Sequence, residues 1–156
     1  RERMLMAFEQ AQQAGDAQRA SDYLTFVIVG GGPTGVELAG ALMEIGRRAM
    51  APDFPVLHRA EFRVILIEGG GRILEAFPPD LSGKAQTALE ALGVTVMVNC
   101  RVHDVTGQGV LAGAQFIRTA NVLWAAGNIA MPRIASLPKG ALCRAWRRSR
   151  CRKVAM

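Results

Sequence analysis

What the sequence most plainly lacks is a cysteine framework. Three cysteines occur in 156 residues, Cys100, Cys143 and Cys151, and they form no CxxC motif and no paired spacing. An odd count without such spacing favours neither a disulfide scaffold nor a zinc site. Neither histidine, His58 or His103, stands at ligand spacing from a carboxylate or a cysteine. We therefore expect no metal site, and reduced thiols are typical of a cytoplasmic protein.

Long apolar runs and a secretory leader are missing as well. No run approaches the roughly 20 apolar residues of a membrane span. The N-terminal stretch RERMLMAFEQAQQAG lacks the apolar core and the small-residue cleavage site of a signal peptide. Hydrophobic residues make up 50% of the sequence and charged residues 21%, which is an ordinary globular composition. We expect one cytoplasmic domain, followed by a tail of different character.

Acidic residues are absent from the last 18 residues, and this absence explains the basic character of the chain. The formal net charge is +6, yet residues 1–138 carry all 13 acidic residues and residues 139–156 carry seven of the 19 basic ones. The basic charge therefore belongs to a tail and not to a patch on a fold. We expect residues 138–156 to be disordered or non-native, and we predict no nucleic-acid partner, although a nucleic-acid-binding arm is the alternative interpretation of the tail.

The N-terminal residues 1–22 are expected to form a helical segment. Met4, Leu5, Phe8 and Ala11 fall on or beside one helical stripe, and Gly15-Asp16 is expected to end the helix. Residues 23–137 then follow a different pattern, in which short apolar runs alternate with amphipathic ones.

That alternation predicts an α/β domain, because short β-branched runs bounded by glycine are typical of buried parallel strands. The predicted elements are a strand at 26–29, a helix from Pro33, an extended excursion at 49–61, a strand at 63–68, a helix capped by Asp80, a strand at 94–98, an antiparallel meander at 101–119 and a strand at 121–127. This order predicts a Rossmann-like doubly wound parallel sheet with a small antiparallel β-meander.

The two main helices are each expected to bury one apolar stripe. On the first helix the inward residues are Val36, Ala39, Leu42 and Met43, and on the second they are Leu81, Ala85, Ala88, Leu89 and Leu92. Pro33 suits the first turn of its helix, where a missing N–H group would have no intrahelical partner.

The stretch TFVIVGGGPTGVELAG contains the GxGxxG pattern, with its glycines at Gly30, Gly32 and Gly35. Because the pattern follows a predicted strand and opens a predicted helix, it indicates a dinucleotide-binding turn. Gly30 would make the tight turn, Gly32 would let a diphosphate approach the backbone, and Gly35 would let the helix pack closely on the sheet. The turn also includes Gly31, Pro33 and Thr34. A glycine-rich turn without a ligand is the alternative.

Glu68 ends the second strand, where a carboxylate can accept hydrogen bonds from the ribose of adenosine and repel a 2′-phosphate. This position favours NADH over NADPH as the cofactor. Glu68 lies farther from Gly30 than the usual spacing of about 20 residues, and the excursion at 49–61 accounts for the excess. A solvated strand end is the alternative, and the nearby Arg63 and Arg72 keep NADPH open.

Three motifs together resemble the type II NADH:quinone oxidoreductases, which are single-chain flavoproteins. They are FVIVGGGPTGVELAGAL, RVILIEGGGRILEAFPPDL and VLWAAGNIAMP, in that order. The resemblance implies that residues 1–137 correspond to the NADH-binding domain, with Glu68 as the ribose-binding acid. It also implies that Glu37, which we expect on the first helical turn, lies near the nicotinamide and takes part in hydride and proton steps. A bland alternative for Glu37 is an acid stabilised by the helix dipole. Ala126 and Gly127 belong to the segment that, by resemblance, returns toward the flavin domain.

Features of the whole family that this sequence does not contain shape the functional hypothesis. The resemblance implies that a whole family member carries an earlier GxGxxG motif for FAD, a later Gly-Asp motif that contacts the flavin, and C-terminal amphipathic segments at the membrane. The resemblance therefore implies NADH, FAD and a quinone as partners, and a place on the cytoplasmic face of the membrane. We expect this chain to be a truncated portion that lacks its FAD-binding half and is inactive alone. The alternatives are a stand-alone NAD(H)-binding module, a domain that works with a separate flavin-binding half, and the NAD(P)H-binding domain of another flavoprotein reductase.

Overall fold

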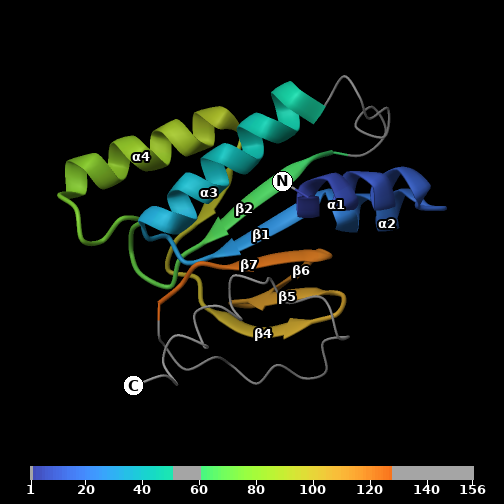
Figure 1. The fold of residues 1–156 in the computed structure, drawn as a ribbon. Coiled ribbons are helices and arrows are strands. Elements are labelled where there is room, and N and C mark those ends of the chain that lie inside the picture. The colour runs from blue at the N-terminus through green and yellow to red at the C-terminus, as the bar shows by residue number, and fades with distance from the viewer. Residues whose placement is uncertain (1, 51–60, 128–156) are drawn as a thin grey trace, which may run out of the picture.

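The structure, a computed structural model, describes residues 2–50 and 61–127. At its centre lies a four-stranded parallel sheet with the strand order β3-β2-β1-β7 (Figure 1). Its strands are β1 (Thr25–Val29), β2 (Arg63–Ile67), β3 (Thr95–Met97) and β7 (Asn121–Trp124). The chain moves outward from β1 to β3 and then returns to the other side of β1, as in a Rossmann-like sheet.

Both faces of this sheet are buried, which is why β1 and β2 read as continuous apolar runs. Successive side chains of a strand point to opposite faces. Phe26, Ile28, Val64 and Leu66 belong to one apolar core, and Val27, Val29, Ile65 and Ile67 belong to the other. A shift of either strand by one residue would exchange the two cores, so the register is tightly specified.

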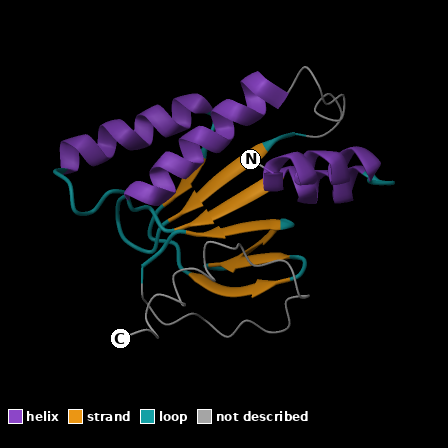
Figure 2. Cartoon of the chain, viewed as in Figure 1, coloured by secondary structure: helices purple, strands orange, loops and turns teal. Residues whose placement is uncertain are grey.

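Each face has its own cover. Helices α3 (Pro33–Glu44) and α4 (Pro79–Leu92) lie on one face, and the short π-helix η1 (Ile45–Met50) continues α3 (Figure 1). An antiparallel sheet of β4 (Val102–Thr106), β5 (Gly109–Ala112) and β6 (Gln115–Arg118) lies on the other face (Figure 2). The predicted fold class is confirmed. In the described part of the chain, the meander takes the place of a second helical layer.

The N-terminal segment contains two helices where one was expected. Helix α1 (Glu2–Gln13) is followed by α2 (Ala17–Leu24), because Asp16 accepts a hydrogen bond from the Arg19 N–H at 2.7 Å and so caps a new helix. The buried face of α1 also differs from the expected one. Leu5 is 38% exposed, whereas Ala7 is buried beside Met4, Phe8 and Ala11.

Helix α3 buries Ala39, Leu42 and Met43 as predicted, with Val36 partly buried. Helix α4 differs from its predicted arrangement. Pro78 is its N-cap and Asp80 lies inside the first turn, so the prediction that Asp80 caps the helix is wrong.

The inward stripe of α4 is also rotated. Leu81 is 50% exposed and Leu92 is 41% exposed, while Ser82 and Leu89 are buried. The hydroxyl of Ser82 donates a 2.6 Å hydrogen bond to the carbonyl oxygen of Ile73, which satisfies a polar group inside the core. Ser82, whose hydroxyl has a backbone partner, is therefore buried in the first turn of α4, where the apolar pattern predicted a buried Leu81.

Several predicted features lie outside the described residues. These are most of the excursion at 49–61, His58, and the tail at 138–156. The division into segments 1–22, 23–137 and 138–156 stays a prediction. Within residues 2–50 and 61–127, no helix is both long enough and apolar enough to cross a bilayer.

Candidate nucleotide-binding site

The candidate site lies at the carboxyl ends of β1 and β2, where ligands bind in open α/β sheets. The turn between β1 and α3 begins at Gly30, whose N–H donates a 2.8 Å hydrogen bond to the carbonyl oxygen of Ile67. The φ angle of Gly30 is 111°, a conformation that favours glycine. This bond ties the start of the turn to the neighbouring strand.

At Gly30, Gly31 and Gly35 the close approach of other protein atoms leaves no room for a larger side chain. A methyl group on Gly30 would lie 2.5 Å from the backbone nitrogen of Ala126, and one on Gly31 would lie 2.9 Å from a side-chain carbon of Ile73. A methyl group on Gly35 would overlap the carbonyl oxygen of Gly30. The turn is therefore closed on its inner side, and Gly35 contacts the turn itself as well as the sheet.

Gly32 differs from the other three, because a methyl group placed on it would meet nothing within 4 Å among the described residues. Gly32 is the N-cap of α3 and Pro33 is the first helical residue, as predicted. The cap makes no side-chain hydrogen bond in the described structure, and Pro33 and Thr34 are exposed. Within residues 2–50 and 61–127, nothing covers the positive end of the α3 dipole at Gly32, which is an arrangement suited to an anion.

The carboxylate of Glu68 lies directly beside this turn and accepts two backbone hydrogen bonds. Its Oε2 atom accepts from the Gly31 N–H at 2.6 Å, and its Oε1 atom accepts from the Gly70 N–H at 2.7 Å. Each carboxylate oxygen has a second lone pair, so Glu68 can still accept from another donor. The pairing of Val29 with Ile67 explains how residues so far apart in sequence become neighbours.

The loop after β2 packs against the glycine turn and contains the second group of glycines. The Leu74 N–H donates to the carbonyl oxygen of Gly31 at 2.7 Å, and the Asn99 N–H donates to the carbonyl oxygen of Gly70 at 2.7 Å. These bonds join the loops that follow β1, β2 and β3. The sequence analysis missed this loop as part of the site, although the Gly-Gly-Gly after Glu68 was a signal for it.

Arg63 and Arg72, the two arginines that leave NADPH as an alternative cofactor, lie in different places. Arg63 begins β2 and pairs with Thr25, so it lies at the end of the strand opposite to Glu68. Arg72 lies in the loop after β2, where its Nη2 atom donates to the backbone oxygen of Glu75 at 2.9 Å. Arg72 is therefore the one of these two that is near the candidate ribose position.

Glu37 is an exposed residue of α3. It is the fifth residue of the helix, and the first turn contains no acid, so the prediction that it lies on the first turn is wrong. The helix begins directly at Pro33, and the dipole effect falls off within the first turn. Ala126 lies against Gly30, whereas Gly127 is exposed, and a methyl group added to it would meet no described residue within 4 Å.

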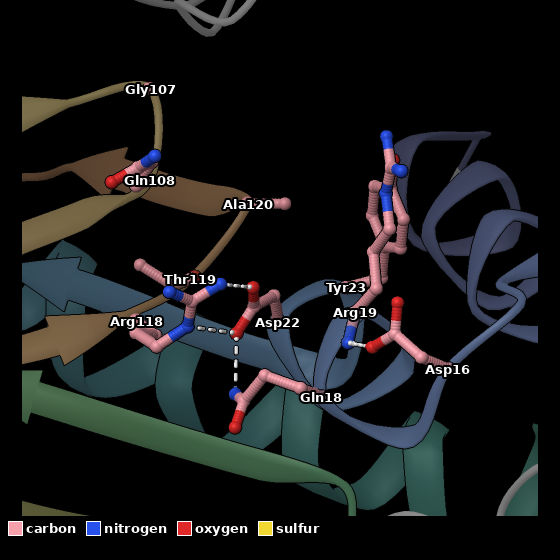
Figure 3. Close-up of a pocket in the computed structure, with 10 residues that line it drawn as sticks. All are labelled: Asp16, Gln18, Arg19, Asp22, Tyr23, Gly107, Gln108, Arg118, Thr119 and Ala120. Carbon is pink, nitrogen blue, oxygen red and sulfur yellow. Dashed lines mark hydrogen bonds and ion pairs between the residues drawn. The ribbon is translucent and has the colours of Figure 1, made fainter.

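A separate cavity lies at the opposite end of β1, between α2 and the turns of the antiparallel sheet (Figure 3). Figure 3 shows Arg118 and Gln18 pointing toward Asp22 from different elements. Arg118 donates to both carboxylate oxygens of Asp22, at 2.6 and 3.1 Å, and Gln18 donates at 3.0 Å. The Ala120 N–H also donates to the backbone oxygen of Asp22 at 2.8 Å. These contacts fasten α2 to the turn before β7, which is a structural role.

The protonation of Asp22 depends on these contacts. Burial acts to raise the pKa of its carboxyl, but the hydrogen bonds from Arg118 and Gln18 and the charge of Arg118 outweigh burial. The pKa of Asp22 therefore lies below its ordinary value of 3.8. The same pair raises the pKa of Arg118.

Comparison with known proteins assigns the chain to a family. The family model for pyridine nucleotide-disulphide oxidoreductases matches residues 3–149. The chain belongs to this family. Its glycine turn and the acid at the end of the next strand thus lie in an oxidoreductase-family domain.

Two curated relatives of this oxidoreductase-family chain are type II NADH:quinone oxidoreductases of Mycobacterium tuberculosis. NdhA is 39% identical over 137 residues, which are 85% of this chain and 29% of the relative. Ndh is 34% identical over 132 residues, which are 81% of this chain and 28% of the relative. The chain therefore spans less than a third of the length of these relatives. The predicted resemblance to type II NADH dehydrogenases is confirmed.

A solved structure of NDH2 from Plasmodium falciparum in complex with NADH shares the fold. The TM-score is 0.75 at 21% identity, and the match covers 81% of this chain and 27% of that chain. At this identity the likeness supports the fold of the oxidoreductase-family domain.

The role of Gly35 can be tested by adding a single methyl group. Gly35→Ala should lower the free energy of unfolding by about 1–3 kcal/mol, because the methyl group overlaps the Gly30 carbonyl oxygen. Gly83→Ala is the matched control within α4, where a methyl group meets none of the described residues within 4 Å, and it should raise stability by about 0.5–1 kcal/mol. Urea denaturation measures both. Equal effects of the two substitutions would contradict the packing described here.

Asp22 should make part of the stability depend on pH. Because its folded pKa is lowered, its contribution is present above the ordinary carboxyl pKa and is lost as the pH falls through the lowered value. Asp22→Asn should therefore lose less stability than the parent chain between about pH 6 and about pH 2, as measured by urea denaturation. Arg118→Gln should flatten the same pH dependence, and the double variant should add little. An unchanged acid profile in Asp22→Asn would refute the ion-pair assignment.

Proposed function

We propose that this chain binds NADH and is the NADH-binding domain of an FAD-dependent NADH:quinone oxidoreductase. The observation that carries the proposal is the shape of the glycine turn. Among the described residues, the turn is closed by protein atoms at Gly30, Gly31 and Gly35 and is open at Gly32, next to the Gly31 N–H that donates to Glu68. The family match and the relatives named type II NADH:quinone oxidoreductase support the same function.

The chemistry of the turn suits a dinucleotide. The diphosphate would lie against Gly32 and the N-terminus of α3, where backbone N–H groups and the helix dipole favour negative charge. The ribose of adenosine would donate a hydroxyl hydrogen bond to Glu68, whose oxygens retain free lone pairs. Pro33 and Thr34, which are exposed, would border the diphosphate, and Gly30, Gly31 and Gly35 would shape the turn behind it.

The remaining proposed site residues would act at the nicotinamide end. Glu37 is exposed on α3, beyond the turn, and we keep it as a residue near the nicotinamide. Ala126 lies against Gly30 and Gly127 follows it, so the segment after β7 borders the turn. These residues would orient the cofactor.

FAD, when bound, would supply the redox chemistry that links NADH to the quinone. We assign no residue in the ranges 2–50 and 61–127 to the binding of FAD. The chain matches less than a third of its relatives' length. We therefore propose that the flavin-binding half is separate from these 156 residues and that the complete enzyme works at the cytoplasmic face of a membrane.

Binding of the dinucleotide can be tested with purified chain and isothermal titration of NADH and NADPH. The parent chain should bind NADH more tightly than NADPH. Glu68→Gln should weaken NADH binding at least about tenfold, because an amide cannot accept the N–H bonds of both Gly31 and Gly70 and loses the negative charge. It should also reduce the discrimination against NADPH. Glu9→Gln, an exposed change on α1, is the control and should alter neither affinity.

The outcomes of this titration separate two parts of the proposal. If the parent chain binds neither nucleotide, the binding function is refuted. If it binds NADH but Glu68→Gln keeps the same selectivity, the ribose assignment of Glu68 is wrong.

The catalytic part of the proposal is tested by activity. The 156-residue chain, mixed with NADH, FAD and a soluble quinone, should oxidise no NADH above the protein-free rate, as followed by absorbance. A whole relative of the type II NADH:quinone oxidoreductases is the positive control. Turnover by the chain alone would show that it needs no separate flavin-binding half.

A further inference from the structure

A second carboxylate lies beside Glu68, in the loop after β2. A methyl group placed on Gly70 would lie 3.3 Å from Glu68 Oε1 and 3.7 Å from Glu75 Oε2. The two oxygens therefore flank the same point, well within the roughly 10 Å over which charges interact in moderate salt. The sequence pattern singled out Glu68 because it ends a strand, whereas Glu75 becomes its neighbour only through the path of the loop.

The loop brings Glu75 back because its backbone is firmly held. The Leu74 N–H donates to the carbonyl oxygen of Gly31 at 2.7 Å, and Arg72 Nη2 donates to the backbone oxygen of Glu75 at 2.9 Å. The backbone of Leu74 is thus tied to the glycine turn, and the backbone of Glu75 is tied to Arg72 in the same loop. The side chain of Glu75 is exposed and, among the described residues, makes no hydrogen bond or ion pair, so its carboxylate can act on a ligand.

Two cations share this neighbourhood. Arg101 Nε would lie 3.7 Å from a methyl group on Gly69, next to Glu68. Arg72 is fastened to the Glu75 backbone, and its Nε atom is buried. With both acids present, the two arginines are balanced by two carboxylates. Without the Glu75 charge, the group formed by Glu68, Arg72 and Arg101 would carry an excess positive charge, which would favour a phosphate.

We propose that Glu75 is a second specificity-determining residue, which together with Glu68 makes the site select NADH over NADPH. This inference rests on the proposed function, because it places the ribose of adenosine at Glu68. Among the described residues, no hydrogen bond joins the Glu75 side chain to the turn that would hold the diphosphate. It acts through charge on the 2′ position, where NADPH carries a phosphate and NADH carries a hydroxyl.

The mechanism is electrostatic repulsion between the 2′-phosphate of NADPH and the carboxylates of Glu68 and Glu75. A 2′-phosphate at Glu68 would approach two carboxylates, and each would raise the free energy of the complex by a screened Coulomb term. NADH has no charge at that position and would be nearly indifferent to Glu75. Removing the Glu75 charge should therefore change the affinity for NADPH and leave the affinity for NADH almost unchanged.

The test uses the purified 156-residue chain and the variants Glu75→Gln and Glu9→Gln. Isothermal titration measures Kd for NADH and NADPH at low salt and again with about 0.5 M NaCl. Glu75→Gln should lower Kd for NADPH about fivefold and change Kd for NADH less than about twofold. Added salt should reduce the effect of Glu75→Gln on the Kd for NADPH, since screening weakens the repulsion between the carboxylate and the 2′-phosphate. Glu9→Gln makes the same change of charge on α1, near the other end of the sheet, and should have no effect (Figure 1).

Each outcome has one meaning. If the parent chain binds neither nucleotide, the proposed function fails and this inference fails with it. If the parent chain binds NADH but Glu75→Gln leaves the NADPH affinity unchanged, or shifts both affinities equally, only the role of Glu75 is refuted. Because the Gln side chain keeps the size of Glu and the Arg72 bond is to the backbone, the variant should unfold like the parent chain, and thermal denaturation checks this.

Discussion

The hydrogen bonds of Glu68 hold together the loops on which the candidate site depends. One carboxylate oxygen accepts from the Gly31 N–H in the turn after β1, and the other accepts from the Gly70 N–H in the loop after β2. A half-buried carboxylate with two backbone donors is well satisfied, and these charge-assisted bonds are stronger than neutral ones. The acid that would recognise the ribose therefore also positions the turn that would receive the diphosphate.

The glycine turn can be so tight because the sheet beneath it is buried on both faces. Helices α3 and α4 seal one face and the antiparallel meander seals the other, so β1 and β2 stay in a fixed register. Gly35 lets α3 begin against the carbonyl oxygen of Gly30, and Ala126 closes the turn from the side of β7. At Gly32 the described structure leaves the backbone open, and a ligand can approach it there.

Local patterns predicted the parts of the fold that depend on neighbours in sequence. The runs of β1 and β2, the GxGxxG turn and the start of α3 at Pro33 were all correct, because apolar periodicity and glycine requirements are local properties. One error concerns a tertiary contact: Leu81 was assigned to the core, but Ser82 is buried there and donates a hydrogen bond to the carbonyl oxygen of Ile73. Other errors are local: Asp16 caps a second N-terminal helix where only an ending was expected, and Pro78 instead of Asp80 caps α4.

The sequence by itself determined the alternation of strands and helices, the glycine turn and an acid at the end of the second strand, because each is encoded within a few consecutive residues. It also determined the family, since its three motifs occur in the right order. Only the tertiary structure decided what those groups contact. Glu68 meets Gly31, and Glu75 lies beside Glu68, because strand pairing and loop packing bring together residues that no short pattern connects.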